Sequence, residues 1–138
     1  MAVQNNPYPW LTPNGLWKPI TYDQIGAATD VVSKDIFISD GYYQVRDVRE
    51  SHSVASDSGT LQVEVLTSGQ DADAGVDQLS SAVNLAGTAD TPVKGTLIST
   101  PTQINPGNRV GLVFGGTLTN MVGMHVTVHL ERLRKGEV

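Results

Sequence analysis

Apolar residues alternate with polar residues in short runs along most of the chain, a pattern typical of strands with one buried face. The run from residue 60 to 66 is the clearest, because Leu61, Val63 and Val65 would share one face of an extended segment. Near the end of the chain, Met124, Val126, Val128 and Leu130 repeat the pattern. Further strands are predicted at residues 31–38, 42–48, 83–85, 93–99 and 109–114.

Turn-forming residues separate these runs. The breaks include Asp57–Gly59, Asn105–Asn108 and the pair Gly115–Gly116. No segment shows sustained helical periodicity, and the best helical candidate, residues 77–83, is short. With 14 glycines and only 17% charged residues, the chain is predicted to be all-β. We expect a β-sandwich of the jelly-roll kind.

The first part of the chain differs from the rest in composition. Four of the seven prolines and both tryptophans lie in the first 22 residues, and closely spaced prolines disfavour helices and central strands. We therefore predict an extended N-terminal arm over residues 1–28 and a sandwich domain over residues 29–138. The aromatic side chains of this arm either fold back onto the domain or anchor on a partner. The candidate anchors are Tyr8, Trp10, Trp17 and Tyr22.

The charge balance and the absence of cysteine exclude several classes of protein. A formal net charge of −5 argues against a nucleic-acid partner, because phosphate contacts need clustered Lys and Arg. Without cysteine, disulfides, thiolate zinc sites and cysteine nucleophiles are excluded. Arg132, Arg134 and Lys135 form the basic cluster of the sequence. They are expected to be a solvated end or to meet an acidic patch on a neighbouring subunit.

One stretch, Val110–Leu130, contains no charged residue and is long enough to span a membrane. Its central Gly-Gly pair and the alternation of its second half favour two strands joined by a turn, so no membrane partner is expected. The first residues, Met1–Pro7, lack the basic and apolar regions of a signal peptide. We therefore expect a protein that is made in the cytosol.

The common catalytic motifs are missing from the sequence, so no enzyme activity and no catalytic residue are predicted. His125 and His129 are four residues apart, which on a strand separates them by roughly 13 Å, too far for one metal ion. Ser51 and His52 are neighbours that would point to opposite faces of a strand.

The acidic run Asp71–Asp77 could surround a calcium ion. However, the EF-hand pattern needs Gly and Glu where this chain has Val76 and Ala82. A solvated acidic loop is the preferred interpretation, and no metal or cofactor is predicted.

Taken together, the turns and strands of Val48–Leu133 resemble those of a class of small virion proteins of tailed bacteriophages. The segments that carry the resemblance are Thr60–Leu66, Leu85–Val93, Gly95–Leu97, Pro106–Leu112, Gly116–Thr119 and Val126–Leu130. The resemblance implies a jelly-roll decoration or cement protein on the outer surface of the phage head, made in the bacterial cytoplasm. It further implies that the protein clamps neighbouring major capsid subunits as a homo-oligomer, a dimer in preference to a trimer, and that the arm reaches across to the shell.

Two other functions stay open. The first is binding of carbohydrates or host receptors, which jelly rolls often perform and which requires exposed aromatic residues. Tyr42–Tyr43 is the candidate platform of the sandwich, and strand alternation would expose one of the two rings. A small β-sandwich hydrolase is the other alternative, although no convergent acid, base and nucleophile can be named.

Overall fold

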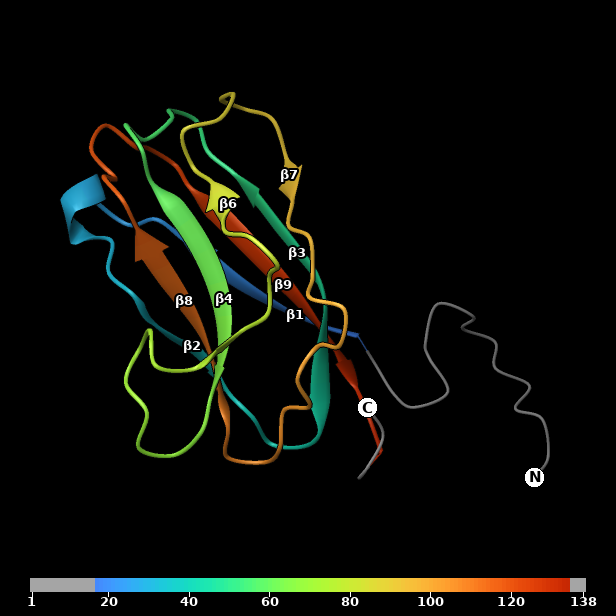
Figure 1. Cartoon of the computed structure of the whole chain (residues 1–138). Helices are drawn as coiled ribbons and strands as arrows, with labels where there is room; N and C mark the ends of the chain where they lie inside the picture. Colours follow the sequence, from blue (N-terminus) through green and yellow to red (C-terminus); the bar gives the residue numbers. More distant parts are fainter. Residues whose placement is uncertain (1–16, 135–138) are drawn as a thin grey trace.

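Two antiparallel β-sheets pack face to face in the computed structural model, which describes residues 17–134 (Figure 1). The strands are β1 (Trp17–Asp23), β2 (Lys34–Ile38), β3 (Tyr43–Ser51), β4 (Thr60–Leu66), β5 (Val76–Asp77), β6 (Val83–Asn84), β7 (Val93–Lys94), β8 (Arg109–Gly115) and β9 (His125–Arg132). A short 3-10 turn, η1 (Ala28–Asp30), lies between β1 and β2. Because both ends of the sequence contribute neighbouring strands, most of the core contacts join distant parts of the chain.

The order of the strands identifies the architecture. One sheet has the order β1-β9-β3-β7, and the other has the order β2-β8-β4-β5, with β6 also paired to β4. The first four strands alternate between the two sheets, and so do β7, β8 and β9. This nested antiparallel wrapping of a long hairpin is the jelly roll, so the predicted fold class is confirmed.

The strand β1 begins inside the segment expected to be an arm. Residues 17–23 pair along their whole length with β9, from Trp17 opposite Glu131 to Asp23 opposite His125. Pro19 is compatible with this pairing because β1 is the outer strand of its sheet. The sandwich therefore begins by residue 17 rather than at 29, and residues 1–16 lie outside the described part of the chain.

The core follows the alternation of the longest strands. In β9, Val126, Val128 and Leu130 are buried, and the intervening residues point outward. The uncharged stretch 110–130 forms β8, a turn and the greater part of β9. Across residues 17–134 there is no helix with the length and apolar character that crossing a bilayer would require.

Two acidic side chains lie inside the fold rather than on strand exteriors or in turns. Glu50 in β3 and Glu64 in β4 are 2% and 0% exposed. The strand β4 is central in its sheet, and the segment after it folds back over its outer side, so both faces of β4 are covered. Alternation alone cannot reveal a second covered face.

Candidate binding surface on the four-stranded sheet

The outer face of the sheet β1-β9-β3-β7 carries a shallow cleft of about 510 Å³. Strand pairing explains how distant residues meet there. Pro19, His129 and Asp47 are opposite one another on β1, β9 and β3, while Arg49 of β3 is opposite Lys94 of β7. The side chains that line the cleft are Trp17, Arg46, Asp47, Arg49, Lys94 and His129.

A β-bulge in β3 builds the middle of this cleft. The pairing with β9 shifts between Val45 and Asp47, so that Arg46 is inserted as an extra residue. Val45 and Val48 are both fully buried although they are three positions apart, which strict alternation forbids. The bulge thus turns both Arg46 and Asp47 toward the outer face, as bulges near binding sites commonly re-aim side chains.

Asp47 lies at the centre of the charges. Its carboxylate accepts a hydrogen bond from Arg49 Nε at 2.7 Å, and Lys94 Nζ and His129 Nδ1 lie 3.8 Å and 3.6 Å away. The side chain of Asp47 is only 14% exposed, whereas those of Arg49 and Lys94 are 58% and 66% exposed. The carboxylate is therefore inside and the cations form the rim, which gives an approaching ligand a positive surface.

Arg46 is paired with Glu131 across the strands, with Nη2 at 3.0 Å from Oε1. Three cations therefore face two carboxylates, so the cleft carries one positive charge in excess when His129 is counted as neutral. This excess stands out in a chain whose net charge is −5.

Several polar atoms of the cleft are buried without a partner. Among the described residues, no hydrogen-bond partner reaches Arg46 Nε, Asp47 Oδ1 or His129 Nδ1. Buried polar groups in native proteins are nearly always satisfied. The cleft is therefore the part of this sheet where unsatisfied polar atoms gather.

Trp17 forms one wall of the cleft. Its ring lies edge-on to the His129 ring, with 6.3 Å between centroids, and the residue is 39% exposed. The cleft thus combines cations, an acceptor and an aromatic ring. None of the six side chains that line it carries a hydroxyl or thiol nucleophile. The arrangement suits binding of an anionic or amphipathic group.

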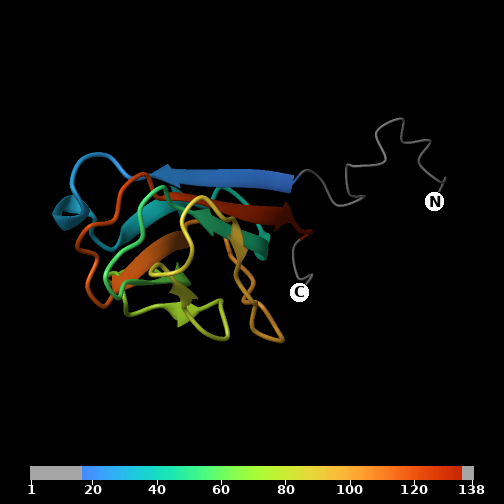
Figure 2. The same cartoon turned by 90° about the horizontal axis from the view of Figure 1, so that it is seen from above.

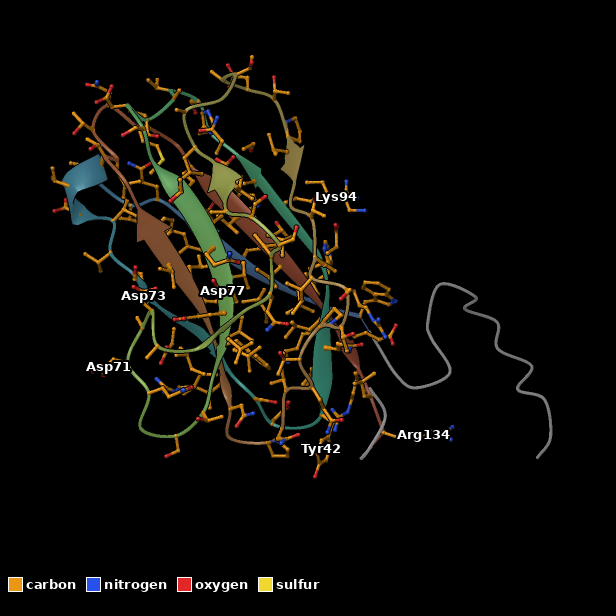
Figure 3. The ribbon with its side chains drawn as sticks, viewed as in Figure 1. Tyr42, Asp71, Asp73, Asp77, Lys94 and Arg134 are labelled. Atoms are coloured by element: carbon orange, nitrogen blue, oxygen red, sulfur yellow. The ribbon has the colours of Figure 1, made fainter. Side chains whose placement is uncertain are left out.

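The aromatic and basic residues singled out in the sequence are dispersed by the fold. Trp17 lies in the cleft, but Tyr22 faces inward and packs on Phe114 with centroids 6.0 Å apart. Arg132 lies over the ring of Tyr43, 5.7 Å from its centroid. Arg134 is exposed beyond β9 (Figure 3). Tyr8, Trp10 and Lys135 lie outside the described residues.

The remaining cleft residues could not be recognised in the sequence. Arg46, Arg49 and Lys94 are scattered among acidic and neutral neighbours, and only the pairing of β3 with β7 and β9 brings them together. His125 and His129 lie partly buried on the outer face of β9, and each is next to a different carboxylate, Asp23 and Asp47 respectively.

The acidic segment 71–77 lies on the other side of the sandwich. Its backbone is held by the buried Glu64, whose two carboxylate oxygens accept hydrogen bonds from the N–H groups of Asp73 (2.7 Å) and Gly75 (3.1 Å). Asp71, Asp73 and Asp77 are exposed, and Figure 3 shows Asp71 and Asp73 at the outside of the fold. The segment is therefore an ordered loop that presents its aspartates to solvent.

The second buried acid, Glu50, belongs to a separate pair next to the cleft. His52 Nδ1 lies 2.7 Å from Glu50 Oε1, and His52 Nε2 lies 3.0 Å from the carbonyl oxygen of Gly87. Both ring nitrogens of His52 are thus engaged, and Ser51 plays no part in either contact. Burial raises the pKa of Glu50. Burial opposes protonation of His52, but the hydrogen bonds to Glu50 and Gly87 outweigh it, so the pKa of His52 is raised.

Comparisons with known proteins leave the family open. No family model and no curated protein matches the sequence. A solved structure from Bacillus endospore appendages, described as a novel family of disulfide-linked pili, aligns with 89% of this chain and 96% of its own chain. The identity is 13% and the TM-score is 0.38, and a similarity of this size carries no argument about function.

Proposed function

We propose that the protein is a structural, non-enzymatic decoration protein that binds the outside of a tailed-phage head and cements neighbouring major capsid subunits as a homo-oligomer. The proposal rests first on the resemblance of the turns and strands of Val48–Leu133 to such virion proteins. The jelly-roll topology is in keeping with that class, although the same fold serves many functions.

The observation that carries the proposal is the position of β1. The described chain begins with β1, an edge strand, so the described part of the sandwich starts at the rim of a sheet. The first described residue, Trp17, is 39% exposed at this rim. A proline- and aromatic-rich segment that starts at a sheet edge has access to surfaces beyond its own domain.

A cementing role follows from mass action. A protein that binds across the seams of an assembled shell, and not to free subunits, stabilises the assembled state. Many copies at equivalent seams make a modest affinity for each one sufficient. A proline- and aromatic-rich sequence such as that of residues 1–16 can contribute main-chain hydrogen bonds and aromatic anchors to such contacts.

The cleft favours one alternative, a carbohydrate- or receptor-binding module of a virion. Its half-exposed Trp17 beside charged side chains is the kind of surface on which a sugar ring packs. The Tyr42–Tyr43 pair offers less aromatic surface to a sugar ring, because Tyr43 is 2% exposed and its hydroxyl donates a hydrogen bond to Asp40 at 2.7 Å. Glycan binding abolished by Trp17→Ala, with head binding unchanged, would support this alternative over cementing.

The test of cementing is co-sedimentation with heads assembled from a tailed-phage major capsid protein. A chain lacking residues 1–16 keeps β1 and is expected to fold but to lose head binding, whereas removal of residues 1–22 would also destroy β1. The substitutions Tyr8→Ala and Trp10→Ala in the full chain make the milder variant. Heads without the protein are expected to release DNA at a lower temperature than complete heads. Undiminished head binding by the truncated chain, or equal melting of the two kinds of head, would contradict the proposal.

A further inference from the structure

The sandwich presents opposite charges on opposite sides. Figure 2 shows β1 and β9 on one side and the segment that follows β4 on the other. In Figure 3, Lys94 of the cleft and Asp71 and Asp73 of the acidic loop lie at opposite flanks of the fold. We infer that copies of this chain associate head to tail, with the acidic loop 71–77 of one copy bound in the cleft of the next.

The loop has the properties of a preformed ligand. Besides the two hydrogen bonds to Glu64, Ala74 donates its N–H to the carbonyl of Asp71 at 3.0 Å, and Gln70 Nε2 donates to the carbonyl of Ala74 at 3.0 Å. A loop that is already ordered loses little conformational entropy when it binds. Its aspartates point away from the fold, and Val76 beside them is 51% exposed.

The cleft offers matching groups. The exposed Arg49 and Lys94 supply cations at its rim, and Arg46 lies in the same cleft with its side chain 35% exposed. Carboxylates are the preferred partners of arginine because their two oxygens match its parallel N–H groups. The exposed part of Trp17 provides an apolar surface for Val76. Asp47 and Glu131 already neutralise part of the charge, so we expect an association that weakens as salt is added.

The two surfaces determine the symmetry of the contact. Because the loop and the cleft lie on different sheets of the same copy, the contact uses two unlike patches and is heterologous. Such a contact either closes into a ring or continues as a chain. This inference builds on the homo-oligomer of the proposed function, but it requires no capsid partner.

Complementary charge-reversal variants test the inference in the full chain. The cleft variant is Arg49→Glu with Lys94→Glu, and the loop variant is Asp71→Lys with Asp77→Lys. Sedimentation velocity at low salt should show the natural chain as an oligomer that dissociates as salt is raised. Each variant alone should weaken self-association by at least about tenfold, as expected for reversed charges in a contact.

Mixing the two variants gives the sharper result. The intact loop of the cleft variant fits the intact cleft of the loop variant, and the reversed loop of the loop variant fits the reversed cleft of the cleft variant. An equimolar mixture should therefore form oligomers in which the two variants alternate. A chain that carries all four substitutions should again form oligomers. Asp57→Lys, an exposed residue in the β3–β4 connection, changes the net charge elsewhere and should leave self-association unchanged.

Either of two results would overturn the inference: a natural chain that is monomeric at low salt, or variants that keep its oligomeric state. If a reversed variant fails to fold, as judged by thermal melting, Lys94→Gln and Asp71→Asn provide the same comparison with a smaller perturbation. Loss of head binding in the cleft variant without any change in self-association would also overturn this inference, while leaving the proposed function standing.

Discussion

Glu50 Oε1 lies 2.7 Å from Nδ1 of His52, and neither side chain has any solvent-exposed surface. Since His52 Nε2 faces the carbonyl oxygen of Gly87, that nitrogen must carry a proton. A second proton lies between Nδ1 and the carboxylate. The folded pair therefore holds a proton that the unfolded chain releases once the pH exceeds the ordinary pKa of histidine.

The first prediction concerns the pH dependence of stability. The pKa of both groups is raised in the folded state, so the folded chain binds protons more tightly than the unfolded chain. The contribution of His52 is fully present below about pH 6.5, its unfolded pKa. It is lost as the pH rises through the raised pKa of the folded state. Urea unfolding at a series of pH values should show a free energy of unfolding that declines above this point.

Two single substitutions separate the contribution of the Glu50–His52 pair from that of other titrating groups. His52→Gln leaves Glu50 buried beside a neutral group and should lower the free energy of unfolding by about 3 kcal/mol or more at neutral pH. The same variant should also make the free energy of unfolding less dependent on pH. Ser51→Ala, next to His52 in sequence but outside both of its contacts, should leave the dependence of the free energy of unfolding on pH nearly unchanged. An unaltered pH slope in His52→Gln would show that the pair does not hold the proton.

The second prediction concerns Glu64, whose two oxygens accept the N–H groups of Asp73 and Gly75. In Glu64→Gln, an NH2 group that cannot accept a hydrogen bond replaces one of the two carboxylate oxygens. One of the two backbone N–H groups therefore loses its acceptor. We expect a loss of about 2–3 kcal/mol in the free energy of unfolding and faster proteolysis within residues 67–77. The comparable change Glu131→Gln, on the outer face of β9, should cost about 1 kcal/mol or less. Equal effects of the two variants would contradict the role of Glu64.

The third prediction compares two glycines with left-handed backbone. Gly116 has a φ of 66°, and a Cβ atom there would lie 2.1 Å from the carbonyl oxygen of Ser58. Gly107 has a φ of 86°, but nothing lies within 4 Å of a Cβ atom at that position. Gly107→Ala should therefore cost only about 1 kcal/mol, the usual strain of this conformation. Gly116→Ala must also move backbone and should cost at least twice as much, measured by thermal or urea unfolding.

Local patterns in the sequence were enough to predict the fold class. The strand Thr60–Leu66 has the predicted limits, and the alternation of β9 places Val126, Val128 and Leu130 in the core as expected. These features depend on neighbouring residues only. The strand β1 was missed because Pro19 argued against a strand, and the edge position that tolerates proline depends on pairing with β9.

The candidate site was predictable only in part. Trp17 was named for its place in an aromatic segment, but Arg46, Arg49, Lys94 and His129 meet through strand register and through a bulge at Arg46. A bulge adds one residue to one strand, and no pattern within β3 alone marks where this happens. The burial of Glu64 likewise depends on a loop that returns over β4 after 9 to 11 residues, and the alternation within β4 gives no sign of this contact.

The last prediction links Asp47 to the proposed contact between copies. Asp47 lies among Arg49, Lys94 and His129 and lowers the positive charge of the cleft. Asp47→Asn preserves the shape of the side chain and removes its charge, so the cleft should attract the acidic loop of another copy more strongly. At low salt we expect self-association to tighten by roughly fivefold, equivalent to about 1 kcal/mol, and the gain should disappear at high salt. Asp57→Asn makes the same change in net charge away from the cleft and should have no such effect. Weaker self-association of Asp47→Asn in sedimentation velocity, with the fold intact by thermal melting, would mean that Asp47 organises the cleft for some other ligand.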